Sequence, residues 1–412
     1  MFQKLSEKEL EHLEKETGAM PDLWGRWLVS KDNLREVINR KMKLPESVII
    51  LDDTLRSGAN MPYVYLNIEE KLEIARKLEE IGVTEIMAGY AGVEEHNEFV
   101  RRLKDEGNSM RLLAKTRGFI PGWKDEIDRA ANCGFDGVNF LLGRIGVALG
   151  AEAMSEEEYK KRVSNCVMHA KERGLFVMGP GTKEGLEAGI DRTTVADGHG
   201  WLRPETMEYN TMRMRDVVGP DVELSIHCHD DFGLATANTL AGLTGGGDAL
   251  EVTVNGYGHR SGNANFEQVV LACEALYGVR TGIKIDKLYE LCKFVEEKFG
   301  MPIAPTAPFV GKHAYCHGGL HIPPLLKDPP EWYRWEPVRA ETLGASRSWM
   351  WHTPALQFDM NGPIAMKIRS MNLSFNEDHL KTIIDKTNKL VKEKNFASDE
   401  ELEEIIKGVI SS

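Results

Sequence analysis

The chain has 412 residues, of which 42% are hydrophobic and 28% charged, and its 64 acidic and 51 basic side chains give a net charge of −13 at pH 7. This composition excludes widespread disorder, and the negative charge argues against nucleic acid as a partner. The length fits one α/β barrel with an appended subdomain.

The sequence also limits the compartment in which the protein works. No apolar run approaches 18 residues, so no membrane span is expected, and the charged N-terminus has no apolar core typical of a signal peptide. The six cysteines are scattered without a CxxC pair, as is typical of reduced thiols in an intracellular protein. We therefore expect a cytoplasmic protein with small-molecule substrates.

From residue 47 onward, strand-like apolar runs alternate with amphipathic helical patterns. The expected strands are Val48–Leu51, Glu85–Ala88, Met110–Lys115, Gly137–Leu142, Leu175–Gly179, Thr193–Ala196, the run from Val222 into His227, and Leu250–Asn255. The expected helices between them are Asn67–Ile81, Glu94–Glu106, Gly122–Cys133, Ser155–Arg173, Thr182–Ala188, Pro204–Val218 and Thr236–Thr244. Strict β/α alternation implies a parallel sheet, and eight repeats close a TIM barrel over residues 47–280.

Two segments flank the predicted barrel. Residues 1–46 form a helical extension to which no chemistry is assigned. Residues 281–412 form a linker and a small, mainly helical subdomain, with a helix expected at Lys287–Phe299 and more helix from Pro363 to Ile410. This part also contains an aromatic cluster, which favours an interface or a small core over a binding face: Trp332, Tyr333, Trp335, Trp349 and Trp351.

The first barrel strand ends in an acidic and basic motif, Asp52-Asp53-Thr54-Leu55-Arg56-Ser57-Gly58. In a barrel, an arginine at a strand end directs its guanidinium into the site, where it can bind a carboxylate or stabilise an oxyanion. By itself the pattern is more often a solvated turn, and its place in the repeat gives it weight.

The seventh strand ends in His227-Cys228-His229. Residues two apart in a strand point to the same side, so the two imidazoles can bind one divalent ion together with ligands from elsewhere. Asn263, in the glycine-rich loop after the eighth strand, offers a neutral oxygen. These donors suit Zn, Mn, Co or Mg, and the alternative is a pair of histidines satisfied by ordinary hydrogen bonds.

Taken together, these motifs resemble the DRE-TIM metallolyase superfamily and, within it, the 2-isopropylmalate, homocitrate and citramalate synthases. The barrel motifs that carry the resemblance are residues 52–58, 196–200 (Ala-Asp-Gly-His-Gly), 227–231 and 255–263. The resemblance continues downstream at residues 281–291, 310–321, 325–333 and 365–373. These segments reach into the tail, which the aldolases and hydroxymethylglutaryl-CoA lyases of the superfamily lack.

The resemblance implies a Claisen-type condensation of acetyl-CoA or another acyl-CoA with a 2-oxo acid, on a divalent ion, in a homodimer. By the same resemblance, His227, His229 and Asn263 are metal ligands and Arg56 stabilises the oxyanion. The implied acid–base residues are His317 or His321, with Tyr333. Asp52, Lys183 and Asp231 are candidate substrate-binding residues beside Arg56.

The sequence departs from the family pattern at several positions. Ser57 replaces a carboxylate metal ligand, and Asp53 is a possible substitute that lies on the order of 10 Å away if the chain is extended. Met87 replaces a glutamate, and His259 replaces a glutamate of the glycine loop and joins the catalytic candidates. Because Lys183 also adds positive charge, we hypothesise a more negatively charged substrate or a different ion.

The sequence leaves two alternative functions open. The first is a lyase or aldolase that cleaves a hydroxy acid or hydroxyacyl-CoA through the same enolate in reverse. The second is a non-catalytic descendant, which Ser57 and Met87 favour. A purely structural barrel does not require the site residues that occur together here, which argues against the second alternative: Arg56, His227, His229, Asp231 and Asn263.

Overall fold

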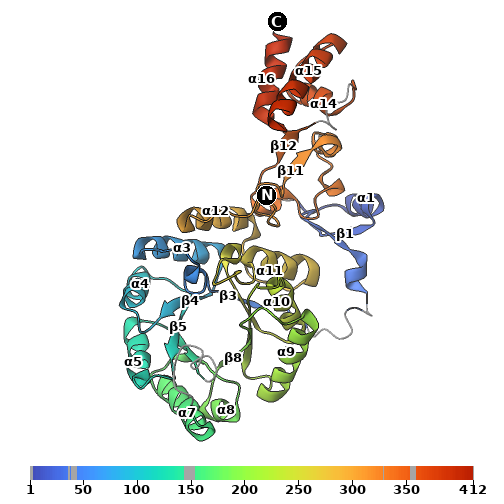
Figure 1. The fold of residues 1–412 in the computed structure, drawn as a ribbon. Coiled ribbons are helices and arrows are strands. Elements are labelled where there is room, and N and C mark those ends of the chain that lie inside the picture. Colours follow the sequence, from blue (N-terminus) through green and yellow to red (C-terminus); the bar gives the residue numbers. More distant parts are fainter. Residues whose placement is uncertain are drawn as a thin grey trace. The chain divides into compact units, whose positions relative to one another are not determined.

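The computed structural model describes residues 3–35, 38, 44–142, 154–327, 329–352 and 359–411. The chain divides into two compact units (Figure 1). One is Asn33–Pro302, and the other joins Met1–Asp32 to Ile303–Ser412.

The larger unit is a closed barrel of eight parallel strands, which confirms the predicted TIM barrel. In barrel order the strands are β10 (Ala249–Val252), β3 (Ile49–Asp52), β4 (Glu85–Tyr90), β5 (Arg111–Arg117), β6 (Gly137–Leu141), β7 (Phe176–Met178), β8 (Arg192–Asp197) and β9 (Glu223–Cys228). Each strand is followed by helical chain, as the alternation predicts, and six of these connections lie fully within the described residues.

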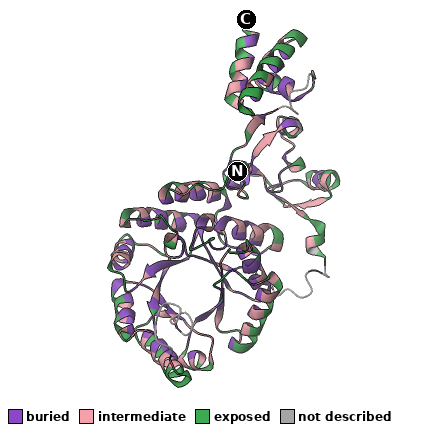
Figure 2. Cartoon of the chain, in the orientation of Figure 1, coloured by how far each residue is buried: buried purple, intermediate pink, exposed green. Residues whose placement is uncertain are grey.

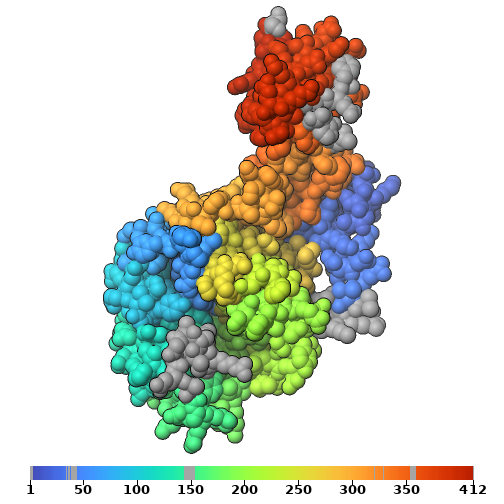
Figure 3. Space-filling model, in the orientation of Figure 1, coloured from blue at the N-terminus to red at the C-terminus, as the bar shows by residue number. Residues whose placement is uncertain are grey.

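The barrel helices bury the faces that pack against the strands and leave their outer faces exposed (Figure 2). They are α3 (Ile68–Ile81), α4 (Glu94–Asp105), α5 (Trp123–Cys133), α7 (Glu156–Glu172), α8 (Lys183–Ala188), α9 (Pro204–Val218), α10 (Ala235–Thr244), α11 (Phe266–Ala272) and α12 (Leu288–Phe299). In the space-filling view, the helices from α3 to α9 form an outer surface of this unit, coloured from blue to green (Figure 3). The predicted capping box at Ser155 and Glu158 starts α7.

Inside the barrel, two layers of side chains lie below the carboxyl ends of the strands. An apolar layer is formed by Leu51, Met87, Leu113 and Met178. Met87, one of the departures from the family pattern, is therefore a packing residue of the barrel interior.

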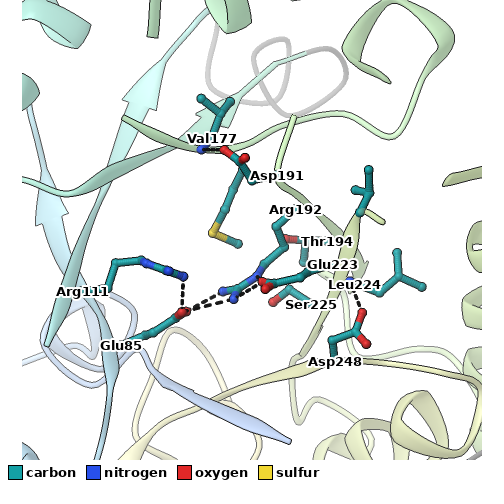
Figure 4. A network of polar contacts seen from close by, with 12 residues as sticks. Glu85, Arg111, Val177, Asp191, Arg192, Thr194, Glu223, Leu224, Ser225 and Asp248 are labelled. Carbon is teal, nitrogen blue, oxygen red and sulfur yellow. Dashed lines mark hydrogen bonds and ion pairs between the residues drawn. The ribbon is translucent and has the colours of Figure 1, made fainter. Parts of the chain in front are cut away.

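Nearer the amino ends of the strands lies a charged layer (Figure 4). The Arg192 guanidinium is fully buried and donates from Nη1 to Glu85 Oε2 at 2.6 Å and from Nε to Glu223 Oε2 at 2.8 Å. Arg111 also pairs with Glu85. In a TIM barrel, residues at the amino ends of the strands contribute to stability, whereas the active site lies at the carboxyl ends.

The smaller unit has a helical tail, as predicted, and short sheets that the sequence did not indicate. Its helices include α1 (Glu7–Thr17), α13 (Ile322–Leu325), α14 (Pro363–Ser370), α15 (Glu377–Lys394) and α16 (Asp399–Ile410). Its strands are β1 (Ala19–Pro21), β2 (Leu28–Ser30), β11 (Cys316–Gly318), β12 (Ser348–Trp351) and β13 (Ala397–Ser398). Of the aromatic cluster, Trp351 is fully buried in the core of the tail, whereas Trp335 is 45% exposed. Among the described residues, none of the helices has the length and apolarity that a membrane span requires.

Candidate active site

Three side chains converge at the carboxyl end of the barrel. Asp53 follows β3, His227 lies in β9 and Glu251 lies in β10, and these three strands are neighbours. Each residue offers one ligand atom, and these atoms lie within 4.8 Å of one another. His227 Nδ1 is 3.0 Å from Glu251 Oε2, yet neither atom makes a hydrogen bond of good geometry within the described chain. Buried polar atoms normally have a hydrogen-bond partner, and a cation bound between these two atoms would satisfy both of them.

Glu251 is the member of this cluster that sequence reasoning missed. Its other carboxylate oxygen accepts hydrogen bonds from Ser225 Oγ at 2.5 Å and Thr194 Oγ1 at 3.2 Å. Burial alone would raise the pKa of Glu251, but the His227 side chain, Lys115 and Ser225 hold it below its usual value. The carboxylate is therefore ionised, as a metal ligand must be. The sequence signal that could have identified Glu251 is a charged residue inside the otherwise apolar run Leu250–Val254.

Of the four predicted metal ligands, the structure brings Asp53 and His227 into this cluster. His229 lies beside it, with its ring centre 5.1 Å from that of His227. Burial and the neighbouring His227 lower the pKa of His229 to about 4, so its imidazole is neutral, the form that binds metals. Asn263 pairs with His229 through the backbone, and its Oδ1 accepts a hydrogen bond from Ser57 Oγ at 3.0 Å.

The segment from Asp53 to Gly58 is a turn, so the extended-chain distance between Asp53 and Ser57 does not apply. The backbone N–H groups of Ser57 and Gly58 donate to Asp53 O at 2.8 and 3.0 Å, and Ser57 N–H also donates to Asp53 Oδ1 at 3.2 Å. The turn thus brings the Asp53 carboxylate back to the position of Ser57. Asp53 can supply the charge that Ser57 lacks.

Arg56 lies between the cluster and a cavity. Its guanidinium pairs with Asp53, while its Nε is buried without a hydrogen-bond partner in the described chain. The cavity has a volume of about 160 Å³. It is lined by Leu55, Arg56, Ala59, Asn60, Val64, Tyr65, Leu66, Lys71, Tyr90, Glu95 and His96. A carboxylate or oxyanion could reach the guanidinium from this side.

His96 is held in one tautomer at the wall of this cavity. The Tyr90 backbone N–H donates to its Nδ1 at 3.0 Å, so Nε2 carries the proton of the neutral ring. The backbone at Gly89 lies close to the His96 ring, because a Cβ added at this glycine would be 2.7 Å from the imidazole. Gly89 also has φ +143°, which favours glycine. Burial and the nearby Lys71 lower the pKa of His96 to about 4.

This shift predicts a pH dependence of stability. Between about pH 6.5 and pH 4 the unfolded chain takes up a proton at His96 that the folded protein does not, so stability present above pH 6.5 is lost as the pH falls. Between pH 7 and pH 5, the unfolding free energy of the wild type should fall by about 2 kcal/mol more than that of His96→Gln. Denaturant unfolding at both pH values measures this. His313→Gln, at an exposed histidine, should behave like the wild type.

The remaining barrel candidates lie around this cluster but have other partners. Asp231 forms a two-point ion pair with Arg260, both distances being 2.8 Å, and Arg260 also contacts His259 Nδ1 at 3.1 Å. Asp52 accepts two hydrogen bonds from Thr54, and burial raises its pKa to about 7. The Lys183 side chain is 79% exposed and has Glu187, on its own helix, as its ionic partner in the described chain. Lys183 is not part of the Asp53, His227 and Glu251 cluster, and its role in substrate binding stays a prediction.

The three predicted acid–base residues lie in the smaller unit. His317 Nε2 lies 3.0 Å from Glu336 Oε1, and Arg347 also binds this buried carboxylate. His321 is exposed against Trp335, and Tyr333 packs edge-on to His12. Among these histidines, His317 has the arrangement of a catalytic base, because a carboxylate fixes its ring orientation.

The fold and this cluster define an α/β-barrel protein with a candidate metal centre at the carboxyl ends of its strands. The HMGL-like family model matches residues 47–295, and the chain belongs to this family of enzymes. It is 33% identical to homocitrate synthase AksA of Methanopyrus kandleri over 92% of this chain and 96% of that protein. It is 39% identical to a putative (R)-citramalate synthase CimA of the same organism, over 74% of this chain and 62% of that protein. A probable 2-isopropylmalate synthase of that organism is 35% identical over 84% of this chain and 70% of its own length.

Among solved structures, the HMG-CoA lyase of Bacillus subtilis superposes with a TM-score of 0.53 at 19% identity. The match covers 64% of this chain and 97% of that one. At this identity the likeness shows the barrel fold alone.

Proposed function

We propose that the protein condenses an acyl-CoA, acetyl-CoA first of all, with a 2-oxo acid to give a 2-hydroxy-2-alkyl dicarboxylate and free CoA. The observation that carries this proposal is the convergence of Asp53, His227 and Glu251 beside Arg56 at the carboxyl end of the barrel. Relatives named as homocitrate, citramalate and isopropylmalate synthases support it. We also propose a cytoplasmic homodimer, by analogy with this family.

In this reaction, Asp53, His227 and Glu251 would hold a divalent cation, with His229 and Asn263 as additional donors next to them. When bound there, such a cation would polarise the 2-oxo group and orient the adjoining carboxylate. A base removes a proton from the acetyl methyl group, the resulting carbon nucleophile forms a bond to the oxo carbon, and water then hydrolyses the thioester.

The residues of the chain have separate tasks. Arg56 stabilises the negative charge that develops on the oxo oxygen, because its guanidinium is buried and faces the cavity. His317 is the proposed base, oriented by Glu336, with Tyr333 as a proton donor and His321 as the alternative base. His259 lies with Arg260 on the loop after β10 and is proposed to help bind the anionic substrate.

Release of CoA tests the proposal directly. Acetyl-CoA is mixed with a panel of 2-oxo acids and with Mg²⁺, Mn²⁺, Co²⁺ or Zn²⁺, and free CoA is trapped with a thiol reagent. We expect CoA release that requires both a 2-oxo acid and a metal, stops with a chelator, and falls about 100-fold or more in Arg56→Lys, which removes the planar guanidinium. A protein that instead forms a 2-oxo acid from a hydroxy acid, without free CoA, would be a lyase.

A further inference from the structure

The N-terminal extension has no role in the chemistry above, although it belongs to the same compact unit as the proposed acid–base residues. Its strands β1 and β2 form an antiparallel hairpin. Asp22 closes the turn between them, because one of its carboxylate oxygens accepts the backbone N–H groups of Arg26 and Trp27 and the other accepts Arg26 Nε at 2.8 Å. The Arg26 guanidinium lies over the Trp27 ring at 4.0 Å. The turn therefore holds Trp27 in a defined position.

The end of this hairpin pairs with a segment more than 300 residues further along the chain. Trp27 and Val338 form an antiparallel bridge, and both residues are buried. Two backbone hydrogen bonds of 2.8 and 2.9 Å flank the bridge and join the hairpin to residues 337–339: Leu28 N–H to Pro337 O, and Arg339 N–H to Arg26 O. The hairpin thus fixes the backbone of residues 337–339.

The fixed segment directly follows Glu336, the carboxylate that orients His317. It also contacts the chain before His317, because the Tyr315 hydroxyl donates to Val338 O at 3.1 Å. On its other side, the Ala340 backbone N–H donates to Glu336 Oε2 at 3.2 Å. The backbone on both sides of the Glu336–His317 pair is therefore tied, directly or through one residue, to the N-terminal hairpin.

The helix α1 contacts the start of the same segment. The His12 ring meets Tyr333 edge-on, with ring centres 6.2 Å apart. One turn further along α1, Glu16 Oε2 lies 3.7 Å from Arg334 Nη2. The extension thus contacts this segment both at the proposed proton donor and just after the carboxylate that orients the proposed base.

We propose that the N-terminal extension positions the acid–base residues of the condensation. Trp27 acts through residues 337–339 and Glu336 on His317, and His12 acts on Tyr333. The inference rests on the proposed function, which gives His317 and Tyr333 their roles. Reaction rates depend steeply on such positions, because a displacement of about 1 Å can lower a rate on the order of 100-fold. Trp27 is a positioning residue, since it acts through Glu336.

The test replaces the buried tryptophan of the hairpin turn. Trp27→Ala should lower kcat by about 10- to 100-fold, while KM for the 2-oxo acid and the metal content change by less than about 3-fold. The metal and the 2-oxo acid are proposed to bind in the larger unit, to which Trp27 does not belong. Trp27→Phe, which keeps an apolar ring, should recover part of the rate. Trp24→Ala, at an exposed tryptophan of the same turn, is the matched control and should change neither value.

A second variant covers the case in which Trp27→Ala does not fold. Asp22→Ala removes the hydrogen bonds that close the turn but leaves the buried tryptophan, and it should lower kcat in the same direction by a smaller factor. Circular dichroism at the assay temperature shows whether each variant is folded.

A double-variant cycle separates positioning from a general loss of stability. If Trp27 acts through His317, adding Trp27→Ala to His317→Gln should lower the residual kcat by less than about 3-fold, whereas independent effects would multiply. An unchanged kcat in folded Trp27→Ala, or the full further loss in the double variant, would overturn the proposal.

Nuclear magnetic resonance gives a readout that does not depend on condensation. In protein labelled with ¹⁵N in its histidine rings, the His317 signal is assigned by its loss in His317→Gln. This signal should shift in Trp27→Ala, because the contact of His317 Nε2 with Glu336 changes, and stay in place in Trp24→Ala. If it responds to Trp27 but no 2-oxo acid supports CoA release, the condensation is wrong and the positioning stands. The positioning is wrong if Trp27→Ala leaves the signal where it is in the wild type.

Discussion

Replacing Glu251 with glutamine is expected to abolish divalent metal binding and to lower the rate of condensation by at least about 100-fold. The substitution keeps the shape of the side chain and its contacts with Ser225 and Thr194, but removes the charge that faces His227 and Asp53. Neutral amides are weak ligands compared with carboxylates, so the cluster loses one of its two anionic donors. Metal content by mass spectrometry and CoA release measure the two effects.

The controls for this experiment distinguish two possible ligand sets. Glu126→Gln changes another buried glutamate, on α5 and paired with Arg117, and should keep its metal and its activity. His227→Ala should lose the metal in either case. If Glu251→Gln retains about one divalent ion per chain while the double variant His229→Ala, Asn263→Ala loses it, the ligands are those predicted from the sequence, and Glu251 is not among them.

Replacing Arg192 with methionine is expected to destabilise the barrel by about 3–5 kcal/mol. The guanidinium is fully buried and binds both Glu85 and Glu223 (Figure 4). Methionine fills much of the volume but leaves the buried Glu85 carboxylate with only Arg111 as its ionic partner among the described residues. Removing one member of a buried ion pair is costly for this reason. Urea denaturation followed by circular dichroism measures the change.

The matched variant for this network is Arg111→Met. Arg111 also pairs with Glu85, but its side chain is 37% exposed and the Arg192–Glu85 pair remains, so a smaller loss is expected. A loss below about 1 kcal/mol in Arg192→Met would show that the network is not an important source of stability. Equal losses in the two variants would show that burial does not set the cost of breaking these pairs.

The barrel could be predicted from the sequence because its signals are local. Apolar runs mark the strands and helical periodicity marks the helices. The helix α9 begins at Pro204 and ends before Gly219, at residues that typically start and stop helices. The eighth strand ends at Val252, earlier than the expected Asn255, because the chain enters a 3-10 turn at Val254–Gly256, within which Asn255 has φ +60°. The strands β11 to β13 have only two to four residues each and pair segments far apart in the chain, so no local pattern indicates them.

The candidate site could be predicted only in part, because it depends on register and turns. His227 and Asp53 stand at strand ends, where the barrel places its chemistry, and the sequence shows this. Glu251 joins them because β9 and β10 pair with Glu251 opposite His227, a register that a single sequence does not reveal. The high exposure of Lys183 likewise follows from tertiary structure.

The most direct test of the proposed condensation follows the carbon–carbon bond itself. Acetyl-CoA labelled with ¹³C in both acetyl carbons is incubated with the metal-loaded protein and each 2-oxo acid of the panel, and the products are analysed by mass spectrometry. With the acid that is the substrate, we predict one labelled 2-hydroxy acid condensation product for each CoA released, and no such product when the metal is chelated. Free CoA with labelled acetate and no labelled condensation product, or intact acetyl-CoA with every 2-oxo acid, would contradict the proposed function.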